Sequence, residues 1–296
     1  MRAIHSVIIG KGKPLIFLPA AGFSGIEGLN IAQSLAERYE CHLLDLPGMG
    51  KSEGIKGEVT KEKIASWLKV YIDQHKMDKA TLIGHSMGGG FAMCFASEYP
   101  ELVNKMVLLD QGHIGIPRLP TKDFGSLGYL MPAISIIEKI YGDRFIRKIE
   151  KFFITENEHK VTDAEFNNQL KTFCERFKVE ESDYIKKALM EDVNFTGEGI
   201  RVMFGYYRLN LPKILMKLTV PCLLIYASFK DIDNKRMQRT TKAIHKIDHL
   251  KNLSVCKIDS HHYVHWSGNR CIEEIKGYLD LNIFPLNYST NEGLTE

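Results

Sequence analysis

Short apolar runs alternate with amphipathic segments along most of this chain, and no other feature constrains its fold more. We place strands at residues 15–18, 42–45, 80–83, 105–109, 222–226 and 253–258. Between them, helical faces are formed by apolar side chains such as Ile64, Trp67, Leu68, Tyr71 and Ile72. Strand–helix–strand units of this kind are typical of a parallel sheet covered by helices. We therefore predict an α/β fold, with a mostly parallel central sheet and helices on both faces.

The first strand-like stretch, residues 1–9, and the strand at 15–18 are separated only by Gly-Lys-Gly-Lys-Pro. Such a short connection predicts an antiparallel hairpin. The sheet is then expected to be mixed at one edge.

The alternation stops after Asp110, and from His113 to about residue 210 the pattern is helical. This insertion lies between two predicted strands, so it should fold over the strand ends, where α/β proteins bind ligands. We predict a core made of residues 1–112 and 210–285, a helical cap at 113–209 and a frayed tail at 286–296.

Composition excludes several classes of protein. Of the 296 residues, 44% are hydrophobic and 25% charged, which is typical of a globular chain and not of a disordered one. A net charge of +3, with both signs evenly mixed, argues against a nucleic-acid partner. The chain has no apolar run of signal-peptide or membrane-spanning length, and its six cysteines form no Cys-x-x-Cys pair. We expect a cytoplasmic monomer or homodimer without membrane contact.

A Gly-x-Ser-x-Gly motif supplies the candidate nucleophile, Ser86, in the run Gly84-His85-Ser86-Met87-Gly88. The motif directly follows an apolar strand and opens a helix, the strand–turn–helix setting of a nucleophile elbow. The tight turn leaves room only for glycine on either side of the serine, and the Met87 amide would face an oxyanion formed on Ser86. The alternative is a plain glycine-rich turn.

A serine nucleophile needs a histidine base and an acid to orient that base. Residues 259–266 read Asp-Ser-His-His-Tyr-Val-His-Trp, between the last strand and the last helix. Here the chain resembles the α/β-hydrolase superfamily, whose members often carry a small residue, Gly and His at this place. Matched residue by residue, His262 is the base and His261 replaces the glycine. We interpret His261 and His265 as supporting or surface histidines, because a zinc site would need further ligands that the local sequence lacks.

The resemblance also implies an acid in the loop after the strand at 222–226. The family usually has a glycine, two or three residues and then Asp, which selects Asp231. Asp233 is one alternative, and Asp110 is another, because some family members place the acid after the preceding strand.

Two further motifs support the resemblance. Residues 45–52, Asp-Leu-Pro-Gly-Met-Gly-Lys-Ser, match a structural turn of the superfamily, and Asp45 stands where a phosphate-binding loop would need glycine. After the strand at 15–18, the family has His-Gly and then the residue that donates the second oxyanion hydrogen bond. This chain has Pro19-Ala20-Ala21, so Ala21 would supply the amide in an altered loop.

The resemblance implies a serine hydrolase, resembling carboxylesterases and lipases, that cleaves an ester or related acyl bond of a small molecule through an acyl-enzyme. No cofactor and no metal are expected. We predict an apolar substrate from the aromatic and apolar side chains of the cap, namely Phe124, Tyr129, Met131, Phe145, Phe152, Phe153, Phe204 and Tyr206. The alternatives are a cofactor-free hydrolase of carbon–carbon bonds, a perhydrolase, and a ligand-binding sensor with little turnover. Epoxide hydrolases and haloalkane dehalogenases are disfavoured, because they usually have Asp where Ser86 stands.

Overall fold

The computed structural model describes residues 3–119, 128–153, 162–191, 193 and 196–281, with the backbone alone for residues 151–153. The expected tail at 286–296, the residue Phe124, and the side chains of Phe152 and Phe153 lie outside this description.

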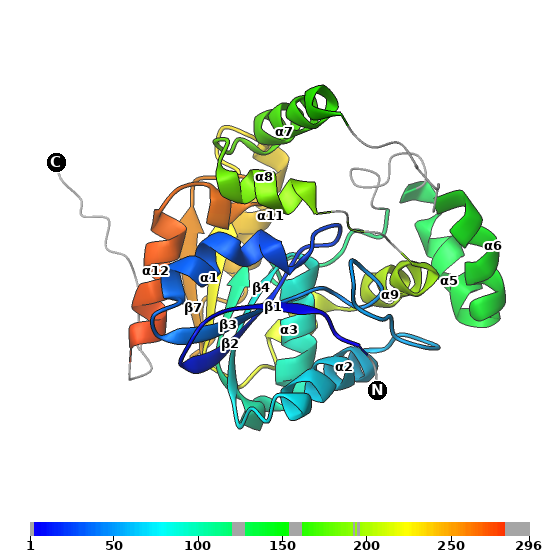
Figure 1. The fold of residues 1–296 in the computed structure, drawn as a ribbon, viewed down its shortest axis with the longest axis horizontal. Coiled ribbons are helices and arrows are strands. Elements are labelled where there is room, and N and C mark those ends of the chain that lie inside the picture. Colours follow the sequence, from blue (N-terminus) through cyan, green and yellow to red (C-terminus); the bar gives the residue numbers. More distant parts are fainter. Residues whose placement is uncertain (1–2, 120–127, 154–161, 192, 194–195, 282–296) are drawn as a thin grey trace.

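A seven-stranded sheet forms the centre of the described chain (Figure 1). Its strand order is β1-β3-β2-β4-β5-β6-β7, and all neighbouring pairs except β1 and β3 are parallel. The strands are β1 (Ser6–Gly10), β2 (Lys13–Leu18), β3 (Tyr39–Leu44), β4 (Ala80–His85), β5 (Val103–Leu109), β6 (Cys222–Ala227) and β7 (Leu253–Ile258). The predicted α/β class and the mostly parallel sheet are therefore confirmed.

The predicted hairpin between the first two strands was wrong, because β1 pairs with β3 and not with β2. The amide of Lys11 donates to the carbonyl of Ala36, and the amide of Lys13 donates to that of Arg38. These hydrogen bonds join the connection between β1 and β2 to residues 36–38, which precede β3. β3 thus lies between the two strands, and the sheet is mixed at this edge as expected.

Two apolar layers pack against the sheet because successive strand side chains point to opposite faces. On one face, Ile16 and Leu82 pack with α2 (Lys61–Gln74) and α3 (Met87–Glu98). On the other face, Phe17 and Ile83 pack with α1 (Leu29–Leu35) and α12 (Arg270–Asp280) (Figure 1). Burial of each such side chain contributes about 1.5–3 kcal/mol.

Further helices complete the described fold. Between β5 and β6 lie α5 (Met131–Tyr141), α6 (Asp143–Phe153), α7 (Asp163–Phe177), α8 (Asp183–Met190), α9 (Gly197–Tyr207) and α10 (Leu211–Leu215). Elsewhere the chain forms α11 (Asn234–Ile244) and the short 3-10 helices η1 (Gly25–Gly28), η2 (Pro100–Leu102) and η4 (Val264–Trp266). The insertion is helical, as predicted, while its division from the core at residues 113 and 209 stays a prediction.

A buried carboxylate joins two of the inserted helices. Glu138 of α5 pairs with Arg201 of α9 and, at 2.8 Å, with Arg208 just after α9. Glu138 and Arg201 are both almost fully buried, and each has a second partner: Arg208 also compensates Glu138, and Asp143 also pairs with Arg201.

Among the described helices, none combines the length and the apolar character that a membrane span requires.

Candidate active site

Ser86 lies in a strained turn between β4 and α3. Its backbone has φ 49° and ψ −119°, a region that residues other than glycine rarely occupy. A Cβ on Gly84 would lie 2.6 Å from the backbone of Gly88, and one on Gly88 would collide with the carbonyl of Leu18. The two glycines are therefore required by sterics, and the turn has the geometry predicted for a nucleophile elbow.

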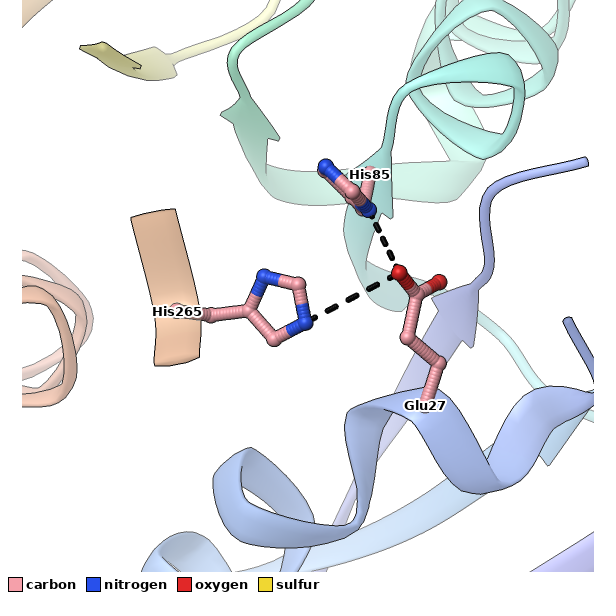
Figure 2. Close-up of side chains that lie close together, drawn as sticks. All are labelled: Glu27, His85 and His265. Carbon is pink, nitrogen blue, oxygen red and sulfur yellow. Dashed lines mark hydrogen bonds and ion pairs between the residues drawn. The ribbon is translucent and has the colours of Figure 1, made fainter. Parts of the chain in front are cut away.

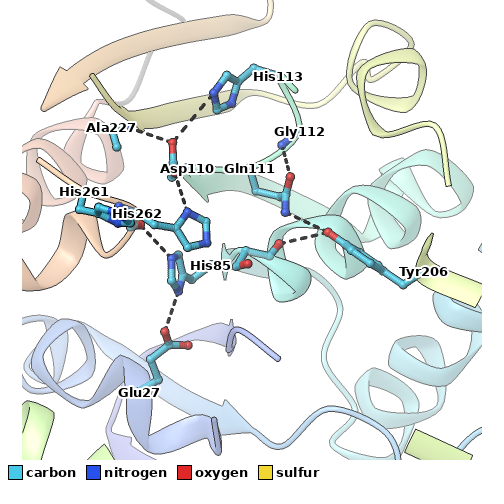
Figure 3. A network of polar contacts seen from close by, with 11 residues as sticks. Glu27, His85, Asp110, Gln111, Gly112, His113, Tyr206, Ala227, His261 and His262 are labelled. Atoms are coloured by element: carbon cyan, nitrogen blue, oxygen red, sulfur yellow. Dashed lines mark hydrogen bonds and ion pairs between the residues drawn. The ribbon is translucent and has the colours of Figure 1, made fainter. Parts of the chain in front are cut away.

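The imidazole of His262 is bonded to Asp110, which follows β5 directly. His262 Nδ1 lies 2.6 Å from Asp110 Oδ2, while Asp110 Oδ1 accepts a hydrogen bond from the amide of Ala227 at 3.0 Å (Figure 3). The amide of Ser86 donates to the carbonyl of Leu109, the residue before Asp110. The elbow and the carboxylate thus lie at the ends of neighbouring parallel strands.

The structure does not bring Asp231, the acid selected from the sequence, to His262. Asp231 is exposed in the turn after β6, with φ +58°, and Asp233 accepts a hydrogen bond from the amide of Arg236 as the N-cap of α11. The carboxylate bonded to His262 is that of Asp110, which the sequence analysis ranked behind Asp231. The family spacing pointed to the β6 loop, but here that loop turns directly into α11.

Charges around this pair set its protonation. Burial lowers the pKa of His262, and the positive charges of His85 and Arg236 lower it further, against the raising effect of Asp110. Burial alone would raise the pKa of Asp110, yet the hydrogen bond and charge of His262, with His113, hold that pKa below its usual value. At neutral pH the pair is therefore a carboxylate and a neutral imidazole. Since the imidazole Nδ1–H is donated to Asp110, its Nε2 carries the lone pair that can accept a proton.

The two amides predicted to form an oxyanion hole are free of hydrogen bonds to the described residues. These are the amides of Ala21, in an exposed turn after β2, and of Met87, the first residue of α3. The carbonyl of Pro19 accepts from the amide of Gly88 at 2.9 Å, which joins the two segments. Free amides at a helix start can stabilise a developing negative charge.

The loop that contains Ala21 is held by a buried glutamate that the sequence analysis did not identify. Glu27 of η1 has no exposed surface, and its Oε2 accepts a hydrogen bond from the amide of Ala20 at 2.6 Å. Its Oε1 lies 2.6 Å from Nδ1 of His85, the elbow residue before Ser86 (Figure 2). Glutamate is rarely fully buried, and nothing in the local sequence around Glu27 indicates a partner 58 positions away.

The other two histidines of the His262 loop take different places. His261 Nδ1 accepts a hydrogen bond from the amide of His262 at 2.7 Å, and burial lowers the pKa of His261 to about 4, helped by nearby positive charges. His265 is buried beside Glu27 and His85, and these three residues form a group whose potential ligand atoms lie within 4.8 Å of one another. The zinc alternative suggested by the sequence concerns a different group, the three histidines His261, His262 and His265.

A tyrosine of the insertion reaches the nucleophile elbow. Tyr206 of α9 packs against Phe91 of α3, accepts a hydrogen bond from Gln111 at 2.9 Å and donates to the carbonyl of Ser86 at 3.5 Å (Figure 3). The inserted helices are thereby linked to the turn that carries Ser86.

The other apolar residues predicted to line a substrate site have mixed positions. Met131 and Phe204 are buried among the inserted helices, Phe145 is half-buried and Tyr129 is exposed. A different aromatic group adjoins the His262 loop, where Phe177 of α7 lies 5.0 Å from His261 between ring centres.

Residues 45–52 form the expected structural turn. The Asp45 side chain accepts hydrogen bonds from the amides of Gly25 and Lys51, and the Ser52 hydroxyl donates to the backbone carbonyl of Asp45.

Comparison with known proteins agrees with this architecture. A family model described as the alpha/beta hydrolase fold matches residues 13–268. The 2-hydroxy-6-oxo-6-phenylhexa-2,4-dienoate hydrolase of Burkholderia cepacia is 32% identical over 155 residues, which cover 50% of this chain and 51% of that protein. The chain spans about half the length of the curated relatives that it matches.

Solved structures resemble the chain over nearly its whole length. E-2-(acetamidomethylene)succinate hydrolase has a TM-score of 0.65 at 15% identity and covers 95% of this chain and 100% of its own. A thermophilic esterase from Thermogutta terrifontis has a TM-score of 0.63 at 18% identity, covering 94% of this chain and 93% of its own. At these identities the likeness establishes the fold alone. Because the family model matches most of the sequence and the sheet and elbow agree with it, this chain belongs to the alpha/beta hydrolase fold family.

Proposed function

We propose that the chain is a serine hydrolase that cleaves an ester or related acyl bond, with Ser86 as nucleophile, His262 as base and Asp110 as the acid. The observation that carries this proposal is the 2.6 Å bond between Asp110 and His262 at the sheet edge where the strained Ser86 lies. A base that is oriented by a carboxylate and stays neutral at neutral pH can take the proton of a serine hydroxyl.

In the proposed reaction, His262 Nε2 removes the hydroxyl proton as Ser86 attacks the carbonyl carbon of the substrate. The Asp110 carboxylate stabilises the imidazolium that forms, and the amides of Met87 and Ala21 bind the oxyanion. His262 then gives the proton to the leaving group, which leaves an acyl group on Ser86. In the second half, His262 takes a proton from water as the water oxygen attacks the acyl carbon. The bond from that carbon to Ser86 Oγ then breaks, and His262 returns the proton to Oγ, which releases the acid product and regenerates Ser86.

The aromatic group beside the His262 loop supports an apolar acyl substrate. Phe173 and Phe177 of α7 contact Tyr263, and Phe173 also contacts Phe23 near the loop that contains Ala21. An apolar group that leaves water against such side chains gains about 25 cal/mol for each Å² that it buries.

A second candidate is hydrolysis of a carbon–carbon bond by the same three residues. It is favoured by the similarity to the Burkholderia cepacia hydrolase, whose named substrate is a hydroxy-oxo-dienoate. That compound contains no ester, so its hydrolysis has to break a bond next to the ketone. A substrate panel that includes both ester and vinylogous diketone substrates separates the two candidates.

The test is covalent labelling by a fluorophosphonate probe together with hydrolysis of p-nitrophenyl esters of graded chain length. We expect the native chain to be labelled, and Ser86→Ala and His262→Ala to lose at least about a thousandfold in turnover. Ser97→Ala is the matched control, because Ser97 lies on α3 and its hydroxyl donates to the carbonyl of Cys94 and accepts from Lys61, neither of which belongs to the proposed site. Absence of labelling and of turnover on both substrate classes in the native chain would contradict the proposal and favour a sensor.

A further inference from the structure

Glu27 joins two of the segments from which the proposed site is built. Its carboxylate oxygens are used separately, Oε2 for the amide of Ala20 and Oε1 for Nδ1 of His85, each at 2.6 Å. Ala20 precedes the proposed oxyanion donor Ala21, and His85 precedes the proposed nucleophile Ser86. A fully buried carboxylate is costly unless it is paired, so these two bonds fix its position.

The second nitrogen of His85 reaches the third segment. His85 Nε2 lies 3.0 Å from the carbonyl oxygen of His262, and the two imidazole rings are 4.7 Å apart between their centres (Figure 3). The oxyanion loop, the elbow and the base loop therefore meet at one buried pair, although they lie far apart in the sequence.

The hydrogen bonds of this pair determine how many protons it holds. A carbonyl oxygen can only accept, so His85 Nε2 must carry a hydrogen. The 2.6 Å approach of Nδ1 to Glu27 Oε1 then needs a second proton, because two lone pairs facing each other at that distance would repel. The pair therefore holds one proton more than a neutral imidazole and a carboxylate.

A metal ion is the other cation that such a group could hold, with His265 as third ligand. However, two ligands on one ion with bonds of about 2 Å are separated by about 3 Å, longer than the observed 2.6 Å between Glu27 and His85. His265 Nε2 is 3.8 Å from Glu27 Oε1, and neither ring nitrogen of His265 has a hydrogen-bond partner among the described residues (Figure 2). The geometry fits a shared proton between Glu27 and His85, with His265 packed alongside.

We propose that Glu27 and His85 form a buried imidazolium–carboxylate pair that positions the Ala20–Ala21 loop and places the positive charge of the His85 ring beside the His262 ring. This inference rests on the proposed function of Ser86 and His262, and it assigns to Glu27 and His85 a positioning role, without contact to the substrate.

The surroundings of the two histidines support this assignment. Burial lowers the pKa of His85, but the charge and hydrogen bond of Glu27 outweigh burial, with smaller raising effects from the His262 carbonyl and Asp110, so that the pKa is raised. The pKa of His262 is lowered by burial and by the charges of His85 and Arg236, against Asp110. The titratable groups that face this pair of histidines are Glu27, Asp110, His113, Arg236, His261, Tyr263 and His265.

The test uses one variant that keeps the shape of Glu27 and one that removes it. Glu27→Gln can still accept from Ala20 and can donate to a neutral His85, so it removes only the charge and the extra proton. Glu27→Ala releases the Ala20 amide as well. Asp45→Asn is the matched control, because Asp45 is also a buried carboxylate that accepts hydrogen bonds from two backbone amides and lies near a histidine, with His5 Nδ1 3.1 Å from Asp45 Oδ2.

For Glu27→Gln we expect the acid limb of the kcat/KM profile to move up by about one pH unit, with the plateau within about threefold of the native value. For Glu27→Ala we expect kcat to fall by about a hundredfold with KM within about threefold, because the oxyanion amide is displaced. Asp45→Asn should leave the acid limb where it is. An unmoved limb in a folded Glu27→Gln protein would overturn the charge effect, and an unchanged kcat in Glu27→Ala would overturn the positioning role.

Two measurements separate this inference from the proposed function. Imidazole titration by NMR should show His85 protonated at neutral pH in the native chain and neutral in Glu27→Gln, whether or not any ester is hydrolysed. Elemental analysis of the purified protein should find no stoichiometric metal. A bound metal that is lost in Glu27→Gln, or a neutral His85 in the native chain, would overturn the pair even if Ser86 reacts as proposed.

Discussion

Two carboxylate–imidazole pairs with the same hydrogen-bond distance lie side by side in this protein. His262 Nδ1 is 2.6 Å from Asp110 Oδ2, and His85 Nδ1 is 2.6 Å from Glu27 Oε1. The side chain of His262 is 19% exposed and its Nε2 has no hydrogen bond to a described residue, whereas His85 is fully buried and bonded at both nitrogens.

The difference shows that a carboxylate neighbour does not by itself decide the protonation of a histidine. The pKa of His85 is raised and that of His262 is lowered, although burial acts in the same direction on both. The second nitrogen and the nearby charges decide the outcome, since His262 lies next to the cations His85 and Arg236. One pair is suited to hold a proton and the other to exchange one.

The largest expected effect comes from breaking the Asp110–His262 pair, which we propose exchanges the proton. In Asp110→Asn the amide can no longer stabilise the imidazolium and favours the wrong tautomer, so we expect kcat to fall by about 10⁴-fold. Ester turnover and circular dichroism of the purified variant measure this. A loss smaller than tenfold in a folded variant would mean that another carboxylate serves His262.

The contrast between histidines with lowered and raised pKa values should also affect the stability of the fold at acid pH. The pKa values are lowered, mainly by burial, for His42, His113, His261, His262 and His265. Below about pH 6.5 the unfolded chain binds protons that these folded rings do not, so stability falls as pH falls. His85 has the opposite effect, because its pKa is raised in the folded chain. Its contribution to stability is fully present below about pH 6.5 and is lost as pH rises through the pKa of the folded state.

We therefore expect the free energy of unfolding to drop by at least about 2 kcal/mol between about pH 7 and about pH 5. Urea denaturation at both pH values measures it. His261→Gln should reduce this pH dependence without removing it, because the pKa of His261 is lowered to about 4 and other buried histidines remain. Equal stability at the two pH values would contradict the assignment of buried neutral histidines.

Arg236→Gln tests whether the positive charge of Arg236 contributes to the lowered pKa of His262. The Arg236 guanidinium lies 4.4 Å from the centre of the Phe229 ring and lowers the pKa of His262. Its removal should move the acid limb of kcat/KM up by a few tenths of a pH unit, an effect that about 1 M salt should reduce in part, because Arg236 is half-buried and its charge is only partly screened. A shift of the same size at low and high salt would indicate a structural change.

The smallest effect is expected for Asp231→Asn. Asp231 is exposed and makes no hydrogen bond or ion pair with a described residue, so turnover should stay within about twofold of the native value. The same assay as for Asp110→Asn applies, which makes the two variants a matched pair. A loss comparable to that of Asp110→Asn would restore the sequence-based choice.

Local patterns account for what could be predicted from the sequence. Ser86 and His262 each lie in a motif of a few residues whose steric and chemical requirements are visible without a structure. The pairing of β1 with β3 and the choice of Asp110 over Asp231 depend on contacts between distant segments. Glu27 could not be predicted, because its burial becomes favourable only when Ala20 and His85 are brought to it.

The backbone of the elbow also limits which nucleophiles this scaffold could accept. Ser86 and Asp110 both have positive φ, 49° and 47°, at the ends of adjacent strands. A side chain branched at Cβ is strongly disfavoured in such a conformation, whereas an unbranched one is tolerated. Exchange of the serine for cysteine or aspartate is therefore open to evolution or design, but exchange for threonine, although it keeps the hydroxyl, is closed by the main chain.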